Sequence, residues 1–265
     1  MAVGWSALGA GEAPFRQVRW GRVVLSLPAG WGQQGPELPV WLHLHGAPAT
    51  VEGEVARVGL PGVLVNVTLP GLSKVYADYF AEPRVLGELL AEVETRLRME
   101  MPGREWKVGA LAVSSFSAGF GGVRQLLRQP AAVDRIQTLV MADSIYCGYA
   151  GDPGRREVDP DLMEGFVGFA RLAVAGKRRL LITHTQQVPE GYASTTETAD
   201  FLIRVLGGTR RAEGQVWSPT LRQISRWSAG GMEIIGFAGS RPEDHLQHLR
   251  ELGRFLERVR RPVVE

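Results

Sequence analysis

The sequence predicts an α/β protein with a mostly parallel sheet that helices cover on both faces. Short apolar runs alternate along the chain with segments of helical period, which is typical of strands joined by crossover helices. The apolar runs lack regularly spaced polar residues, as expected for strands buried on both sides. No internal repeat or linker divides the 265 residues, so we expect a single domain over residues 1–265.

In the first half of the chain, apolar runs bounded by glycine and proline predict strands at residues 23–27, 40–44, 63–67 and 108–113. Apolar residues at steps of three and four predict an amphipathic helix over residues 83–99, with Pro83 near its first turn. A further helix is expected from about Gly119 to Arg128.

In the second half, strands are predicted at residues 138–141, 179–183, 224–227 and 232–237, the last two joined by a hairpin turn at Gly230-Gly231. A loop rich in Gly, Pro and Asp precedes a helix that ends near residue 175, and residues 148–175 are a candidate small cap. Ser194 and Glu197 have capping-box spacing and predict the start of a helix. A final helix is expected over residues 243–259.

Composition excludes several classes of protein. With 45% apolar and 22% charged residues, the chain is predicted to be a soluble globular protein. The 30 basic and 28 acidic residues leave a net charge of +2, which predicts no nucleic-acid partner. No run reaches the roughly 18–20 apolar residues of a membrane span. The single cysteine, Cys147, excludes an internal disulfide and a multi-thiolate metal site.

The sequence also limits the expected location and cofactors. Met1 to Pro14 lack the basic start and apolar core of a signal peptide. We therefore expect a cytoplasmic protein, or a secreted one whose signal had been removed. No phosphate-binding glycine loop follows a predicted strand, and no histidine or acidic cluster has convincing metal-ligand spacing, so no cofactor or metal is predicted.

The segment Ser115-Phe116-Ser117-Ala118-Gly119 lies between a predicted strand and a predicted helix. A nucleophile elbow needs small residues two places before and two places after a nucleophile held on a tight turn. Ser115 and Gly119 fill those places around Ser117, although the first is usually glycine. The alternative is an ordinary turn in which Ser117 caps the following helix.

The strand that ends at His45-Gly46 is a candidate for the oxyanion site. Acyl transfer needs donors for an oxygen that becomes negative in the transition state. We expect the backbone N–H groups of Ala118 and Ala47 to serve, with Gly46 beside the substrate. The alternative is a plain strand end at which His45 bonds only to backbone.

Among the five histidines, His245 is the preferred general base because it follows the last predicted strand and the order nucleophile, acid, base is kept. His248 is less favoured. Asp143 directly follows the strand at 138–142 and is the preferred acid, with Glu190 in reserve. A helix cap or loop former is the other interpretation of Asp143.

Two tyrosines are candidates for substrate contact. Tyr76 and Tyr146 are expected on loops at predicted strand ends, where they could line an acyl or aromatic pocket. Core packing is the alternative for both.

Together, His45-Gly46, the elbow around Ser117, Asp143 and His245 resemble the α/β-hydrolase superfamily, in particular its serine esterases. The resemblance covers about residues 18–259. It implies an eight-stranded, mostly parallel sheet and a serine hydrolase with Ser117, Asp143 and His245 as its triad. Ser115, and an acid after the sixth rather than the seventh strand, depart from the commonest pattern.

The function predicted from these residues is hydrolysis of a carboxylic ester through an acyl-enzyme. A small-molecule ester or acyl compound is the expected partner. Amide, peptide or thioester hydrolysis by the same residues is the alternative, since a fold does not assign a substrate. A hydrolase-like protein that only binds is a third possibility. The sequence leaves the acyl and alcohol groups and the oligomeric state open.

Overall fold

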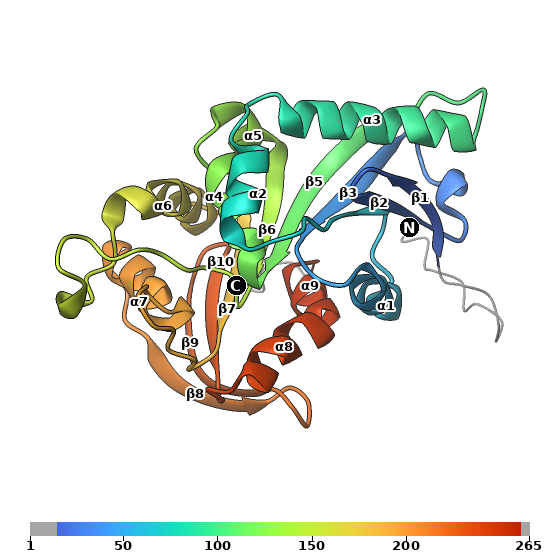
Figure 1. Cartoon of the computed structure of the whole chain (residues 1–265). Helices are drawn as coiled ribbons and strands as arrows, with labels where there is room; N and C mark the ends of the chain where they lie inside the picture. Colours follow the sequence, from blue (N-terminus) through green and yellow to red (C-terminus); the bar gives the residue numbers. More distant parts are fainter. Residues whose placement is uncertain (1–14, 261–265) are drawn as a thin grey trace.

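The computed structural model describes residues 15–260; residues 1–14, on which the prediction about a signal peptide rests, and 261–265 lie outside this part. Within it, ten strands form one sheet in the order β1-β2-β4-β3-β5-β6-β7-β10-β9-β8 (Figure 1). The strands are β1 (Phe15–Trp20), β2 (Val23–Pro28), β3 (Glu37–Leu44), β4 (Val63–Val67), β5 (Lys107–Phe116), β6 (Ile136–Ala142), β7 (Arg179–His184), β8 (Arg211–Val216), β9 (Arg222–Ala229) and β10 (Met232–Phe237).

The predicted mostly parallel sheet is confirmed for its central strands. From β4 through β3, β5, β6 and β7 to β10, every neighbouring pair is parallel. The outer strands β1, β2, β8 and β9 pair in the antiparallel sense. The expected number of eight strands is wrong, because the described residues contain ten. Most of β1 and all of β8 are exposed or partly exposed, so these edge strands lack the apolar pattern of a buried strand.

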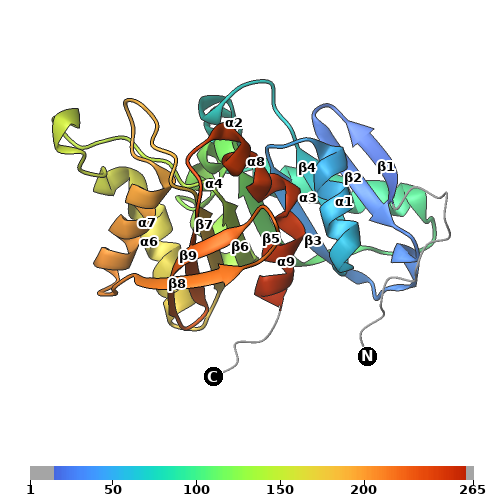
Figure 2. The same ribbon diagram turned by 90° about the horizontal axis from the view of Figure 1, so that it is seen from below.

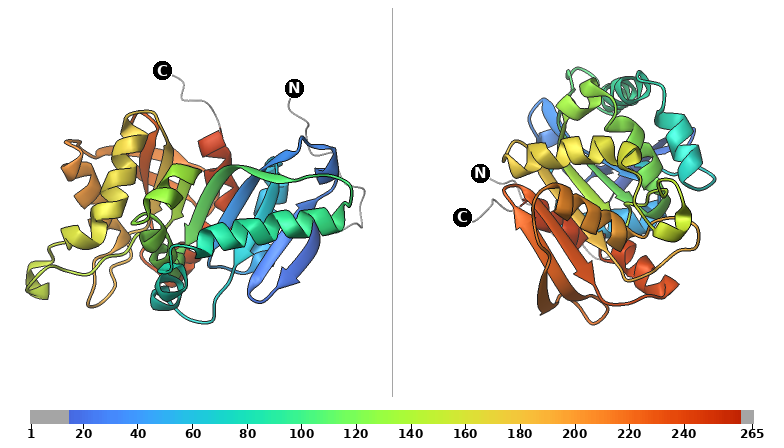
Figure 3. Two further views of the ribbon diagram at one scale, coloured as in Figure 1. Left: turned by 90° about the horizontal axis from the view of Figure 1, so that it is seen from above. Right: turned by 90° about the vertical axis from the view of Figure 1, so that its left-hand side faces the viewer.

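Helices cover both faces of the sheet, and each face has its own apolar core. On β3, Leu42 packs into one core and Trp41 into the other, because successive side chains of a strand point to opposite faces. Figure 2 shows α1 (Pro48–Val58), α8 (Pro242–Arg250) and α9 (Leu252–Arg260) on one face. The other face carries α2 (Ser73–Phe80), α3 (Val85–Glu100), α4 (Phe120–Leu126), α5 (Pro130–Arg135), α6 (Pro160–Val174) and α7 (Thr195–Val205) (Figure 3).

The last predicted helix is two helices, α8 and α9, which meet at Glu251. The change of direction brings the N–H of Gly253 within 2.9 Å of the Glu54 carboxylate on α1. A Cβ atom on Gly253 would lie 2.5 Å from the Glu54 carbonyl oxygen. The close packing of α9 on α1 therefore explains why an apparently continuous helical pattern is interrupted.

The candidate cap at residues 148–175 contains two different parts. The helix α6 packs against β7 and β10 and connects β6 to β7 as a crossover. Residues 148–159 precede it as a loop with one short 3-10 turn, Pro153–Arg155, and only this loop remains available for a cap. The predicted capping box at Ser194 and Glu197 is present at the start of α7. Across residues 15–260, we find no helix with the length and apolar character to cross a membrane.

Candidate active site

Three residues with strained backbone lie directly after three neighbouring parallel strands. His45, Ser117 and Asp143 follow β3, β5 and β6 and have positive φ angles of 70°, 47° and 44°. Such angles are rare for residues other than glycine, and they concentrate at functional sites. Only one other non-glycine residue in the described range, Arg156, has a positive φ. Because parallel strands end at the same edge of the sheet, the three residues share that edge.

The turn that carries Ser117 is as tight as the elbow prediction requires. A single 3-10 turn, Ser117–Gly119, separates β5 from α4. A Cβ atom on Gly119 would lie 2.3 Å from the carbonyl oxygen of Leu44 on β3, and one on Gly121 would lie 2.0 Å from that of Ser73. These glycines are therefore needed for α4 to pass close to β3 and α2.

The unusual Ser115 is accommodated by a buried polar contact. Its Oγ lies 2.8 Å from the Oγ of Ser144, and Ser144 donates to the carbonyl oxygen of Ser117 at 2.8 Å. Ser115 and Ser144 are fully buried, so each hydroxyl needs a partner. A serine in place of the usual glycine thus connects the elbow to the segment that follows β6.

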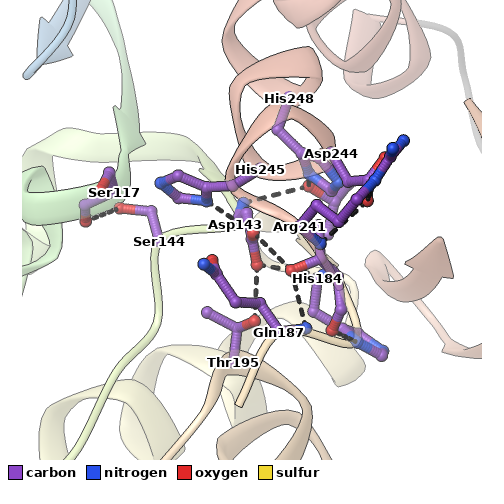
Figure 4. A network of polar contacts seen from close by, with 12 residues as sticks. Ser117, Asp143, Ser144, His184, Gln187, Thr195, Arg241, Asp244, His245 and His248 are labelled. Atoms are coloured by element: carbon purple, nitrogen blue, oxygen red, sulfur yellow. Dashed lines mark hydrogen bonds and ion pairs between the residues drawn. The ribbon is translucent and has the colours of Figure 1, made fainter. Parts of the chain in front are cut away.

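The predicted acid and base are in direct contact. His245 lies in the first turn of α8, and its Nδ1 lies 2.7 Å from Oδ2 of Asp143. Asp143 is completely buried, whereas 14% of the His245 side chain is exposed. Figure 4 shows the ring of His245 extending from α8 toward Ser117, with Asp143 on its other side. The ring of Phe116, next to Ser117 in sequence, stacks on His245 with centroids 4.5 Å apart.

Two threonines that sequence reasoning missed complete the environment of Asp143. Thr185 donates to the carboxylate through its N–H at 3.0 Å and its hydroxyl at 2.8 Å, and Thr195 donates at 2.5 Å. Burial opposes ionisation of Asp143, but the hydrogen bonds from His245 and Thr195 outweigh it and lower the pKa well below its ordinary value. Asp143 is therefore an ionised, fully bonded partner for His245. The sequence signal that could have identified Thr185 and Thr195 is the concentration of hydroxyl residues after β7 and before α7.

The structure separates the other candidates from this contact. Glu190 is exposed. Asp244, although next to His245, accepts a hydrogen bond from the N–H of Arg241 at 2.9 Å and caps α8. His248 is buried, with Nδ1 2.8 Å from the hydroxyl of Thr183, and burial lowers its pKa to about 4.

His43, on β3, and His45, directly after it, are engaged in structural contacts. The Nδ1 of His43 lies 2.8 Å from the Ser114 hydroxyl and its Nε2 lies 2.8 Å from the carbonyl of His45. The Nδ1 of His45 lies 3.0 Å from the hydroxyl of Tyr76. Both nitrogens of His43 are therefore occupied, which explains this residue without a metal.

The expected loop position of Tyr76 is wrong, since it lies on α2 and is completely buried. Its hydroxyl accepts a hydrogen bond from the N–H of Leu69 at 2.9 Å and contacts His45. The buried hydroxyl of Tyr76 therefore supports the ring of His45.

Tyr146 is only partly buried and belongs to an aromatic group beside the elbow. Its ring lies 5.5 Å from that of Phe120 and 5.7 Å from that of Tyr192. Phe120 is one helical turn beyond Ser117, and burial raises the pKa of Tyr146. These three rings form an aromatic group, Phe120, Tyr146 and Tyr192, one member of which opens α4 directly after the turn that carries Ser117.

The two expected oxyanion donors lie in turns after β3 and β5. Ala47 precedes Pro48 at the start of α1, and Gly46 has a φ of 133°. The hydroxyl of Thr68 donates to the carbonyl of Gly46 at 3.0 Å. Ala118 is buried in the turn after Ser117.

The strand order, the tight turn after β5 and the contact between Asp143 and His245 at the same sheet edge are those of the α/β-hydrolase fold. No protein-family model and no curated protein sequence matches the chain.

Solved structures that are similar to the chain include serine hydrolases and esterases. An IroE-like serine hydrolase from Shewanella oneidensis is 12% identical with a TM-score of 0.47, over 89% of this chain and 74% of the other. An uncharacterised protein from Capnocytophaga ochracea is 12% identical with a TM-score of 0.50, over 94% of this chain and 65% of the other. A feruloyl esterase module from Clostridium thermocellum is 10% identical with a TM-score of 0.49, over 89% and 83%. At these identities the likeness concerns the fold alone.

Proposed function

We propose that the protein is a serine hydrolase that cleaves carboxylic esters of small molecules through an acyl-enzyme. The observation that carries this proposal is the 2.7 Å contact between His245 Nδ1 and Asp143 Oδ2. It lies at the sheet edge where Ser117 occupies a strained turn. A base that is oriented by a buried carboxylate beside a strand-to-helix turn whose serine is partly exposed is the arrangement that activates a serine hydroxyl.

The proposed reaction has two steps. The Ser117 Oγ attacks the ester carbonyl, its proton passes to Nε2 of His245, and the carbonyl electron pair moves to oxygen. Collapse of this adduct breaks the bond to the alkoxy group, which leaves with the proton from His245. Water then attacks the acyl group in the same way, and the carboxylic acid departs as Ser117 recovers its proton.

Asp143 is proposed to fix His245 for both steps. A carboxylate on Nδ1 keeps the proton on that nitrogen and leaves Nε2 free to accept one from Ser117. The ionised carboxylate also stabilises the imidazolium that forms. Because Asp143 is buried and hydrogen-bonded by Thr185 and Thr195, its carboxylate needs little rearrangement during the reaction.

The N–H groups of Ala118 and Ala47 are the proposed donors to the oxyanion. Gly46 supports this role because its φ of 133° is a backbone conformation that residues with a side chain rarely adopt, and an added Cβ atom would lie 2.9 Å from the Leu249 side chain. The aromatic group is proposed to contact the acyl or alcohol part of the ester through Tyr146. Residues 148–159, which follow Tyr146 closely, are the proposed cap segment.

The test is turnover of p-nitrophenyl butyrate by the parent enzyme and by Ser117→Ala. We expect turnover by the parent and a fall to background in the variant, with a melting temperature close to the parent's. The exposed Ser228 supplies a matched control, since Ser228→Ala should leave turnover unchanged. Full activity of Ser117→Ala would show that another group is the nucleophile. Faster cleavage of the corresponding p-nitroanilide than of the ester would contradict the assignment to esters.

A further inference from the structure

We propose that two side-chain hydroxyls, those of Thr68 and Ser144, aim the two N–H groups of the oxyanion site; this inference rests on the proposed function. Thr68 follows β4 and Ser144 lies just after β6, so they flank the β3–β5 pair on opposite sides. Neither is proposed to touch the substrate. They act as positioning residues through the backbone.

The first peptide unit joins Gly46 to Ala47. Its carbonyl oxygen accepts a hydrogen bond of 3.0 Å from the hydroxyl of Thr68. In a trans peptide the C=O and N–H bonds point in opposite directions, and the described chain has no cis peptide bond. Since the carbonyl is drawn toward the β4 side, the N–H of Ala47 is directed toward the β5 side, where Ser117 lies.

The second peptide unit joins Ser117 to Ala118. Its carbonyl oxygen accepts a hydrogen bond of 2.8 Å from Ser144 (Figure 4) and a second one from the backbone N–H of Phe120 at the start of α4. This carbonyl is drawn toward the β6 side, so the N–H of Ala118 is directed back toward β3. The two N–H groups therefore converge on the space between the ends of β3 and β5, which is where an oxyanion attached to Ser117 needs donors.

The positive φ angles explain why these peptides need anchors. Gly46 has a φ of 133° and Ser117 one of 47°, and a strained backbone persists only where surrounding contacts hold it. Ser144 has one proton and uses it for the Ser117 carbonyl, so Ser115 is the donor in the 2.8 Å contact between the two hydroxyls. The serine at the usual glycine position of the elbow thereby orients Ser144.

The experiment compares Thr68→Val, Thr68→Ser and Ser144→Ala with the parent on p-nitrophenyl butyrate. Valine keeps the shape of threonine without its hydroxyl, and serine restores the donor. The control is Ser26→Ala, which removes a hydroxyl that is as buried as that of Ser144, bonds to Glu52 at 2.5 Å and lies on β2. We expect kcat to fall about 10-fold to 100-fold in Thr68→Val and Ser144→Ala, with KM within about 2-fold and parental activity in Thr68→Ser and Ser26→Ala.

A second readout is inhibition by an alkyl trifluoromethyl ketone, which forms a tetrahedral adduct through Ser117 and so places an oxyanion in the site. Its affinity should weaken by the same factor as kcat/KM in Thr68→Val and Ser144→Ala, and the pH profile should keep its midpoint because His245 and Asp143 are intact. Parental kcat in both variants of an active enzyme, or an equal loss in Ser26→Ala, would overturn this inference alone. An inactive parent that a fluorophosphonate does not label would overturn the proposed function, and this inference with it.

Discussion

The Nδ1 of His245 lies 2.7 Å from Oδ2 of Asp143, and this contact joins two residues that are 102 positions apart in the sequence. It brings the first turn of α8 to the end of β6. Asp143 is fully buried there, so the carboxylate can act only on groups that the fold presents to it.

Replacing Asp143 by asparagine should lower kcat by roughly 10⁴-fold, because an amide no longer fixes the proton of His245 on Nδ1. The measurement is kcat and KM on p-nitrophenyl butyrate, with circular dichroism to verify folding. Glu190→Gln is the matched control, since Glu190 is exposed and should retain parental kcat. If Glu190→Gln lost activity and Asp143→Asn kept it, the acid would be the residue after β7.

The elbow should be intolerant of a single methyl group. Gly119→Ala would place a Cβ atom 2.3 Å from the Leu44 carbonyl oxygen, and we expect a loss of about 3 kcal/mol in the free energy of unfolding. Gly87, on α3, has no atom within 4 Å of an added Cβ. Gly87→Ala should therefore stabilise the protein by about 0.5–1 kcal/mol. Urea denaturation of both variants distinguishes steric crowding from a general effect of alanine. Equal changes in the free energy of unfolding would contradict steric crowding at Gly119.

Three buried histidines should make stability depend on pH. Burial lowers the pKa of His43 to about 4, of His184 to about 3 and of His248 to about 4. The unfolded chain, with histidine pKa values near 6.5, binds more protons between about pH 4 and 6.5, so stability is full above this window and falls as pH is lowered through it. Each histidine contributes up to about 1.4 kcal/mol per pH unit.

The check is the free energy of unfolding, measured with urea at several pH values from 7 to 4.5. The lowered pKa of Asp143 acts only below its ordinary value near 3.9 and leaves this window unaffected. His184→Gln should reduce the slope, because one of the buried histidines is then absent from both states. A free energy that stayed constant from pH 7 to 4.5 would show that these side chains titrate alike in both states.

The aromatic group should matter for the size of the substrate. Tyr146→Ala is expected to raise KM about 5- to 10-fold for p-nitrophenyl benzoate and much less for p-nitrophenyl acetate, because only the larger acyl group reaches the ring. Tyr79, on α2 and outside the proposed cap segment, packs edge-on against Phe80 and is the matched control. Equal effects of Tyr146→Ala and Tyr79→Ala on both esters would contradict a direct contact with Tyr146.

The central fold could be predicted because buried strands carry a strong local signal. The apolar runs at residues 63–67 and 232–237 coincide with β4 and β10. The edge strand β8 is exposed throughout, so its sequence lacks the apolar pattern by which a buried strand is predicted. The break at Glu251 also escaped prediction, because it depends on the packing of Gly253 against α1.

The residues of the candidate site were likewise predictable from the sequence only in part. Ser117, Asp143 and His245 could be chosen from chain order and small-residue spacing. Their supporting side chains could not, because Thr185, Thr195 and Ser144 are ordinary residues whose importance arises from contacts across the fold. Tyr76 was misplaced for the same reason, since only the packed structure places its hydroxyl against His45.

The role of Ser117 as the nucleophile is tested most directly by the site that a fluorophosphonate modifies, found by mass spectrometry of the intact protein and then of its peptides. We expect one adduct per chain, on Ser117, and strongly slowed labelling in His245→Gln. If the folded parent protein gained no adduct, or gained the adduct on another serine, the claim that Ser117 is the nucleophile would be contradicted.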